Sequence, residues 1–167
     1  MSEIQGLPAH PLLVHGPIVL VPLIALLALV LVVKRSWRAT LGPWVVLLAV
    51  VMVGMTIVAS GAGEELQANV KETDLVRHHA QLGDSMKPIS LALLVALVLL
   101  VAPAWAYARG SRPAVLARLA TSSAWNIISV VLVVVTAVLA TYWIIQTGHS
   151  GAESVWHNVK MINKGEE

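Results

Sequence analysis

The sequence predicts an all-α membrane protein with four transmembrane helices. Of its 167 residues, 57% are hydrophobic and only 12% are charged, and the mean hydropathy is +0.80, whereas soluble domains average about half apolar and a quarter charged. Four uncharged stretches are also long enough to cross a hydrocarbon core of about 30 Å, which takes roughly 20 helical residues. We therefore expect one transmembrane domain over residues 1–167, embedded in a lipid bilayer.

The four predicted spans are rich in Val, Leu, Ile and Ala, and they cover residues 12–33, 41–60, 88–108 and 124–147. Val and Ile favour strands in water, but a lone strand in lipid leaves its backbone polar groups unpaired, so helices are expected. The short links at 34–40 and 109–123 predict two antiparallel hairpins. The first span is expected to remain in the protein, because no Lys or Arg precedes it and its apolar run is too long for a signal peptide.

The longer segment 61–87 joins the two hairpins and is expected to be partly helical. A helix that starts at Thr73 or Asp74 places four residues on one stripe, namely Leu75, His79, Leu82 and Met86. Leu66 and Val70 fall on the opposite side of that helix, so the segment should be broken in its middle. We expect a short amphipathic helix on the outer membrane surface before the third span.

The charges divide sharply between the two sides of the predicted bundle. The short links hold six basic residues and no acidic one, which are Lys34, Arg35, Arg38, Arg109, Arg112 and Arg118. The other polar segments carry a net charge of −4. By the positive-inside rule the links are cytoplasmic, so both termini and segment 61–87 face outward from a bacterial inner membrane. Four of the tryptophans fall near the cytoplasmic boundary, as interfacial indoles should: Trp37, Trp44, Trp105 and Trp125.

Composition excludes several functional classes. The chain has no cysteine, which removes disulfides, iron–sulfur clusters, thiol catalysis and covalent c-type haem attachment. A net charge of +2 with scattered basic residues gives no reason to expect a nucleic-acid partner. The spans contain no charged residue for an ion-coupled transporter or a proton pump. Hydrolase motifs are absent, so we expect an electron-transfer or accessory subunit more than a stand-alone enzyme.

All six histidines fall at or beyond the outer end of the predicted bundle: His10, His15, His78, His79, His149 and His157. They come from three separate segments, whose ends become neighbours when the helices pack antiparallel. Imidazole is the commonest nitrogen ligand of metals and of haem iron. A cluster of small residues follows the second span, including Gly61 and Gly63, and allows either close helix packing or a flat macrocycle between helices. The alternative is that the histidines serve only as hydrogen-bonding or capping groups.

The local sequence around each histidine indicates which of them are the better candidate ligands. His15 lies inside the first helix, where polar side chains normally face the bundle interior and carry function, so it ranks above the cap-like His10. His79 shares the apolar stripe and should point inward, whereas His78 should be solvated.

A second candidate constellation lies after the fourth span, where His149, Glu153 and His157 recur at spacings of four. On a helix all three would share a face. They could bind a divalent cation such as copper or zinc together with His15 and His79, or Glu153 could orient an imidazole. A solvated tail is the alternative interpretation.

With GLPAHPLLVHGPIVLVPL, HHAQLGD and TGHSGAESVW in view, the chain resembles a widespread family of uncharacterised bacterial four-helix membrane proteins. That family has an HPLLVHFPI-like start, an H-x-x-LG stretch before the third helix and a GHxGG-like motif after the fourth. The resemblance makes His10, His15, His79 and His149 the motif histidines. Gly16 stands in place of the usual Phe, and Ala152 in place of the second glycine of the last motif.

Members of this family are similar in architecture to small b-type cytochromes, and some relatives are joined to c-type cytochrome domains, which implies a redox setting. Our leading hypothesis is one haem b near the outer face, bound by two of His15, His79 and His149, with the third near a propionate or a quinone and His10 as a further candidate. Two axial histidines favour electron transfer over oxygen chemistry.

A single outer haem needs a further carrier to complete a circuit, so we expect a quinone, a cytochrome partner on the outer face or a larger respiratory or photosynthetic membrane complex. Two alternatives stay open. One is a non-catalytic accessory subunit of a larger complex, and the other is a copper or zinc protein that uses the outer histidines.

Overall fold

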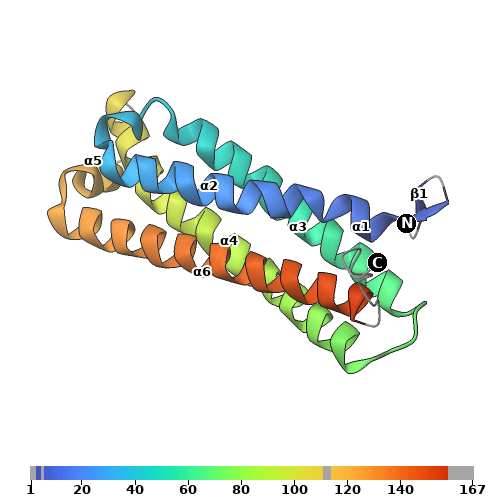
Figure 1. Ribbon diagram of the computed structural model, residues 1–167. Coiled ribbons are helices and arrows are strands. Elements are labelled where there is room, and N and C mark those ends of the chain that lie inside the picture. The colour runs from blue at the N-terminus through green and yellow to red at the C-terminus, as the bar shows by residue number, and fades with distance from the viewer. Residues whose placement is uncertain (1–2, 5, 111–113, 158–167) are drawn as a thin grey trace, which may run out of the picture.

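The computed structural model describes residues 3–4, 6–110 and 114–157. Four long helices form a bundle (Figure 1), and these are α2 (His15–Val33), α3 (Gly42–Gln67), α4 (Asp74–Ala108) and α6 (Ser123–Trp156). The shorter elements are β1 (Glu3–Ile4), β2 (Leu7–Pro8), α1 (Ala9–Leu13), the 3-10 helix η1 (Arg35–Trp37) and α5 (Ala114–Thr121). All four long helices, α2 together with α1, are long and apolar enough to cross a membrane, which confirms the predicted fold class at this level.

Each long helix packs against two others, α2 and α4 each lying against α3 and α6. The helix axes alternate in direction along the chain (Figure 1). One end of the bundle carries α1, the α3–α4 loop and the end of α6, and we call it the cavity end. The other carries η1 and α5, and we call it the basic end.

The core combines large and small apolar side chains. Ile24, Leu31, Met52, Leu93 and Leu97 are fully buried, and alanines separate them on the facing helices, among them Ala28, Ala49, Ala137 and Ala140. Small residues let helix backbones approach closely, which gives helices their van der Waals contact in a membrane. The outer faces of the same helices expose Val, Leu and Ile, as expected for surfaces that contact lipid.

The first span is interrupted at Val14, which separates α1 from α2. Pro17 has no N–H to donate to the carbonyl of Leu13, and its ring crowds that carbonyl, so the chain bends one turn before it. Helix α1 begins at Ala9, after Pro8. His10 therefore lies inside a helix and not at the cap-like position that the sequence indicated.

The segment 61–87 is broken in its middle, as predicted. Helix α3 continues to Gln67, and α4 begins at Asp74 after Thr73, whose hydroxyl oxygen accepts a hydrogen bond from the Val76 N–H at 3.2 Å. The separate amphipathic helix does not form among the described residues, because residues 61–67 and 74–87 prolong α3 and α4. An ion pair between Glu64 and Lys87 joins these two prolonged helices.

The basic end contains a buried cation that the sequence placed only in a loop. Arg38 is 6% exposed. Its Nε donates to the carbonyl of Leu31 at 2.8 Å, its Nη2 to that of Val32 at 3.1 Å, and its Nη1 to Oδ1 of Asn126 at 2.7 Å. The guanidinium thus caps the C-terminal carbonyls of α2, which attract cations, and links them to α6.

Candidate functional site

A cavity of about 590 Å³ opens at the cavity end, between α1, α2, α3, α4 and α6. Its inner part is apolar, with walls that include the buried Pro17, Met86 and Ile144. Its rim is polar. Two imidazoles, those of His10 and His79, line the cavity from different helices. The bundle therefore offers an open-ended cavity in which two imidazoles lie beside an apolar surface.

His10 reaches the cavity from α1 and is held against α3. Its Nδ1 lies 2.9 Å from the carbonyl oxygen of Ala59. The ring packs on Gly63, where a Cβ would come within 2.9 Å of the His10 Cε1 atom. Glycine at position 63 thus leaves room for the imidazole in this orientation.

His79 reaches the cavity from α4 and is held against α6. Its Nδ1 lies 3.1 Å from the carbonyl oxygen of Thr147 and 3.1 Å from the hydroxyl of the buried Ser150. The ring packs on Gly151, where a Cβ would again come within 2.9 Å of the Cε1 atom. His79 therefore points inward, as its place on the apolar stripe predicted.

The two histidines are held by the same local arrangement. In each case the imidazole packs on a glycine and bonds to the carbonyl four residues before it, Ala59 for Gly63 and Thr147 for Gly151. In an α-helix this carbonyl also accepts the hydrogen bond of the glycine N–H. The imidazole therefore lies beside the glycine and fills the space that a side chain there would take. The pair formed by α1 and α3 thus repeats the pair formed by α4 and α6. Three residues in each pair make this arrangement: a histidine, a glycine and the residue four positions before the glycine.

A carbonyl can only accept a hydrogen bond, so each Nδ1 donates to it, and in the neutral tautomer with the proton on Nδ1 the Nε2 atom has a free lone pair. A backbone acceptor at one ring nitrogen is the usual way in which proteins orient an imidazole that ligates a metal through the other. The ring centroids of His10 and His79 are 6.0 Å apart, and their planes make an angle of 71°. The site therefore presents two oriented imidazoles close to each other.

One predicted ligand, His15, lies outside this cavity. His15 is exposed, and its Nδ1 is 3.3 Å from the carbonyl of Leu12, so the prediction that it faces the bundle interior is wrong. Helix α2 buries Pro17, Val21 and Ile24, and His15 lies about 200° around the helix from Pro17, which turns it outward. His78 is exposed, as predicted.

The second constellation does not form a metal centre. Helix α6 continues to Trp156, so the spacing of His149 and Glu153 is helical, but both side chains and that of His157 are exposed. Among the described residues, no group of three or more His, Asp or Glu side chains is placed to hold a metal ion. The cavity takes Thr147, Gly148 and Gly151 from this part of the chain, while His149 is directed away.

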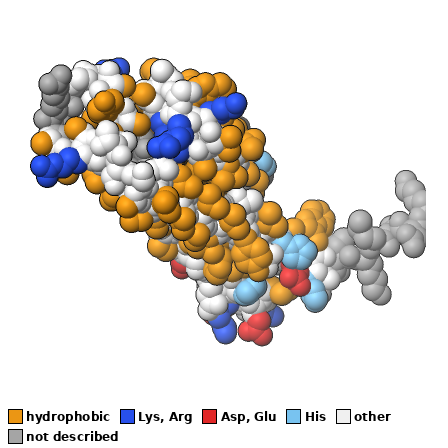
Figure 2. All heavy atoms as spheres, turned by 90° about the vertical axis from the view of Figure 1, so that its left-hand side faces the viewer, with side chains coloured by type: hydrophobic (Ala, Val, Ile, Leu, Met, Phe, Trp, Pro, Cys, Tyr) orange, Lys and Arg blue, Asp and Glu red, His pale blue; other side chains and the backbone are white. Residues whose placement is uncertain are grey.

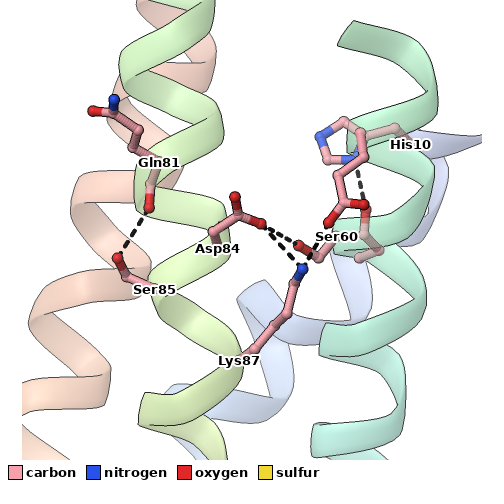
Figure 3. A network of polar contacts seen from close by, with 8 residues as sticks. His10, Ser60, Gln81, Asp84, Ser85 and Lys87 are labelled. Carbon is pink, nitrogen blue, oxygen red and sulfur yellow. Dashed lines mark hydrogen bonds and ion pairs between the residues drawn. The ribbon is translucent and has the colours of Figure 1, made fainter. Parts of the chain in front are cut away.

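A polar network lies at the cavity rim and joins α3 to α4 (Figure 3). The Lys87 Nζ lies 2.7 Å from Glu64 Oε1 and 3.1 Å from Asp84 Oδ1, and the Ser60 hydroxyl donates to the same Asp84 oxygen at 3.3 Å. Exposed ion pairs of this kind contribute little free energy. Their effect is to fix the side chains that surround the cavity entrance.

Four helices that are long and apolar enough to cross a membrane are typical of a multi-pass helical membrane protein. The family model described as "Predicted membrane protein (DUF2231)" matches residues 6–163, and the chain belongs to this family. The match includes every helix that lines the cavity. No curated protein and no solved structure matches the chain.

Proposed function

We propose that this protein binds one b-type haem in the cavity, with His10 and His79 as the two axial ligands, and takes part in electron transfer. The observation that carries the proposal is the pair of imidazoles, each fixed through Nδ1 by a backbone carbonyl, that line one cavity from opposite helix pairs. The sequence hypothesis chose His79 from α4, and the position of its side chain at the cavity supports that choice. The structure favours His10 over His15 and His149 as its partner.

The two ring centroids are 6.0 Å apart, a separation at which both imidazoles could hold one group between them. Two metal–nitrogen bonds of about 2 Å each fit within that span. With only two histidines available, a copper or zinc centre is the weaker candidate.

The cavity also suits the size and polarity of the group. Its volume of about 590 Å³ falls within the range of roughly 300–1,000 Å³ that is usual for cofactor sites. The apolar walls match a macrocycle, and Lys71 at the rim offers positive charge to its carboxylates. The glycines at 63 and 151 supply the flat surfaces against which the ligand rings pack.

Haem b supplies one-electron transfer when it is bound, and ligation on both sides leaves no position for oxygen. The residues of the chain would position the haem and form its surroundings. The carbonyls of Ala59 and Thr147 would orient each imidazole through its Nδ1, and the side chains of Met86 and Ile144 would form apolar walls beside the group. A fixed environment of this kind reduces the rearrangement that accompanies a change of charge.

The proposal includes a membrane orientation and partners. The basic links and the cavity lie at opposite ends of the bundle, so the positive-inside rule puts the cavity and both termini on the outer side of a bacterial inner membrane. A haem at that level would exchange electrons with a quinone or with a cytochrome or larger complex that docks there.

Absorption spectroscopy of the purified protein tests the proposal. We expect a Soret band, sharp α and β bands after dithionite reduction, and one haem per chain. A colourless protein that contains stoichiometric copper or zinc would replace haem with a metal ion. A protein that has neither, and that does not bind added haemin, would leave the role of an accessory subunit.

A further inference from the structure

Four exposed basic side chains gather at the basic end, far from the cavity: Lys34, Arg35, Arg109 and Arg118. They belong to the α2–α3 link, the end of α4 and α5. Figure 2 shows Lys and Arg side chains near this end and most of the acidic and His side chains near the other. The sequence has no acidic residue in 4–63 or in 85–152. These cations therefore have no carboxylate from their own end of the chain, and their counter-charge must come from elsewhere.

The cations are interleaved with exposed aromatic and aliphatic side chains. Trp37, Trp44 and Tyr107 are 44%, 69% and 62% exposed. The Arg109 guanidinium carbon lies 4.8 Å from the centroid of the Trp105 ring, a cation–π contact that lays the arginine along the indole. Trp and Tyr concentrate at the level of lipid headgroups, where one edge of the ring is apolar and the other is wet.

Helix α5 adds an amphipathic element to this surface. It packs against α4 and α6, and it exposes both Val115, at 66%, and Arg118. A short helix with an exposed apolar side chain and a basic residue is suited to lie in a membrane interface, with aliphatic atoms toward the acyl chains and the guanidinium toward phosphate.

We propose that the basic end is a binding surface for anionic phospholipids, with Arg109 and Arg118 engaging the phosphodiester headgroups. The four exposed cations have no acidic residue at their own end of the bundle, so an anionic partner would supply the complementary charge. A lipid fits better than free phosphate, because the exposed Val33, Leu41 and Val115 around the cations are suited to contact acyl chains. This inference is independent of the cavity and of any haem.

The test measures thermal unfolding of the protein in a neutral detergent with added phosphatidylglycerol, phosphatidylcholine or inorganic phosphate. Phosphatidylglycerol should raise the midpoint by at least 3 °C, and 0.5 M NaCl should abolish the rise. Phosphatidylcholine and inorganic phosphate should leave the midpoint unchanged. Equal effects of the two lipids would overturn the proposal, and so would a full effect of inorganic phosphate, which would indicate a simple anion site.

Matched variants locate the surface. R109Q and R118Q should each lose at least half of the phosphatidylglycerol effect, whereas R77Q, which removes one exposed arginine at the cavity end, should keep it. Native mass spectrometry provides a second readout, since the same two variants should retain fewer phosphatidylglycerol molecules even if their own midpoints change. Equal retention by R77Q and R118Q would contradict the assignment.

Discussion

The two ends of the bundle treat buried polar groups in opposite ways. At the basic end the donors of Arg38 reach three acceptors, two carbonyls of α2 and the side chain of Asn126. At the cavity end each of two imidazoles has one ring nitrogen bound to a carbonyl, and both rings line an internal space. The contacts of Arg38 stabilise the fold. The two imidazoles instead line a cavity, and binding sites of this kind commonly cost a protein some stability.

The largest expected effect comes from removing an imidazole at the cavity end. H10A and H79A should each abolish the reduced α band, because a single axial ligand does not hold the low-spin iron. H78A and H15A remove exposed imidazoles and should keep the full band. Absorption spectra of the four purified variants check this. A full band in H10A or H79A would remove that residue from the ligand pair.

Removal of the buried cation Arg38 at the basic end should lower stability and leave haem binding unchanged. R38M keeps an apolar chain of similar length but leaves the carbonyls of Leu31 and Val32 without their cationic donor, so we expect a loss of about 3 kcal/mol. For a chain of this size, that lowers the unfolding midpoint by roughly 6–12 °C.

R35M is the matched control for R38M, since Arg35 is an exposed cation in the same link. Thermal scans in detergent should show R35M close to the parent protein. A comparable loss in both variants would mean that Arg38 acts through general charge and not through its three hydrogen bonds.

Replacement of Gly63 or Gly151, the glycines on which the two imidazoles pack, should have an intermediate effect on haem binding. G63A and G151A place a methyl group where it would come within 2.9 Å of an imidazole carbon, so the ring must turn and its bond to the carbonyl is weakened. Haem affinity should fall between about tenfold and a hundredfold, as for other changes that misorient a metal ligand.

G54A and G61A are the controls, because an added Cβ at either position meets no atom within 4 Å and neither residue lines the cavity. Haemin titration of the purified proteins compares the four variants. If G61A weakens haem binding as much as G63A does, the loss comes from a change in helix α3 and not from contact between the added methyl group and the imidazole.

The smallest effect should separate the two otherwise similar histidines. Only His79 has a hydroxyl partner beside its carbonyl, that of Ser150. S150A should therefore weaken haem binding by about tenfold, and S150T should restore part of it. S85A removes a hydroxyl that bonds to the Gln81 carbonyl away from the two rings and should have no effect in the same titration.

The sequence predicted the fold class because membrane helices follow from hydropathy alone. It also predicted the start of α4 at Thr73–Asp74 and the inward direction of His79, since both depend on local spacing. It failed for His15, because the break at Val14 and the buried face of α2 decide which way that side chain points. It did not predict that imidazoles pack on Gly63 and Gly151, because each of these contacts depends on a histidine from another helix.

The role of Arg38 was also beyond the sequence. A positive-inside count treats Arg38 like Arg35, yet one is buried on three acceptors and the other is exposed. The difference depends on where α6 brings Asn126, a contact between residues far apart in the chain. Long-range contacts of this kind are not encoded in any local pattern.

Electron paramagnetic resonance of the oxidised protein tests the central claim most directly, because it reports the axial ligands of ferric haem. The account predicts a low-spin signal from two imidazoles in the parent protein and its conversion to a high-spin signal, or its loss, in H10A and in H79A. A low-spin signal that survives unchanged in both variants would contradict the assignment of the cavity as the haem site.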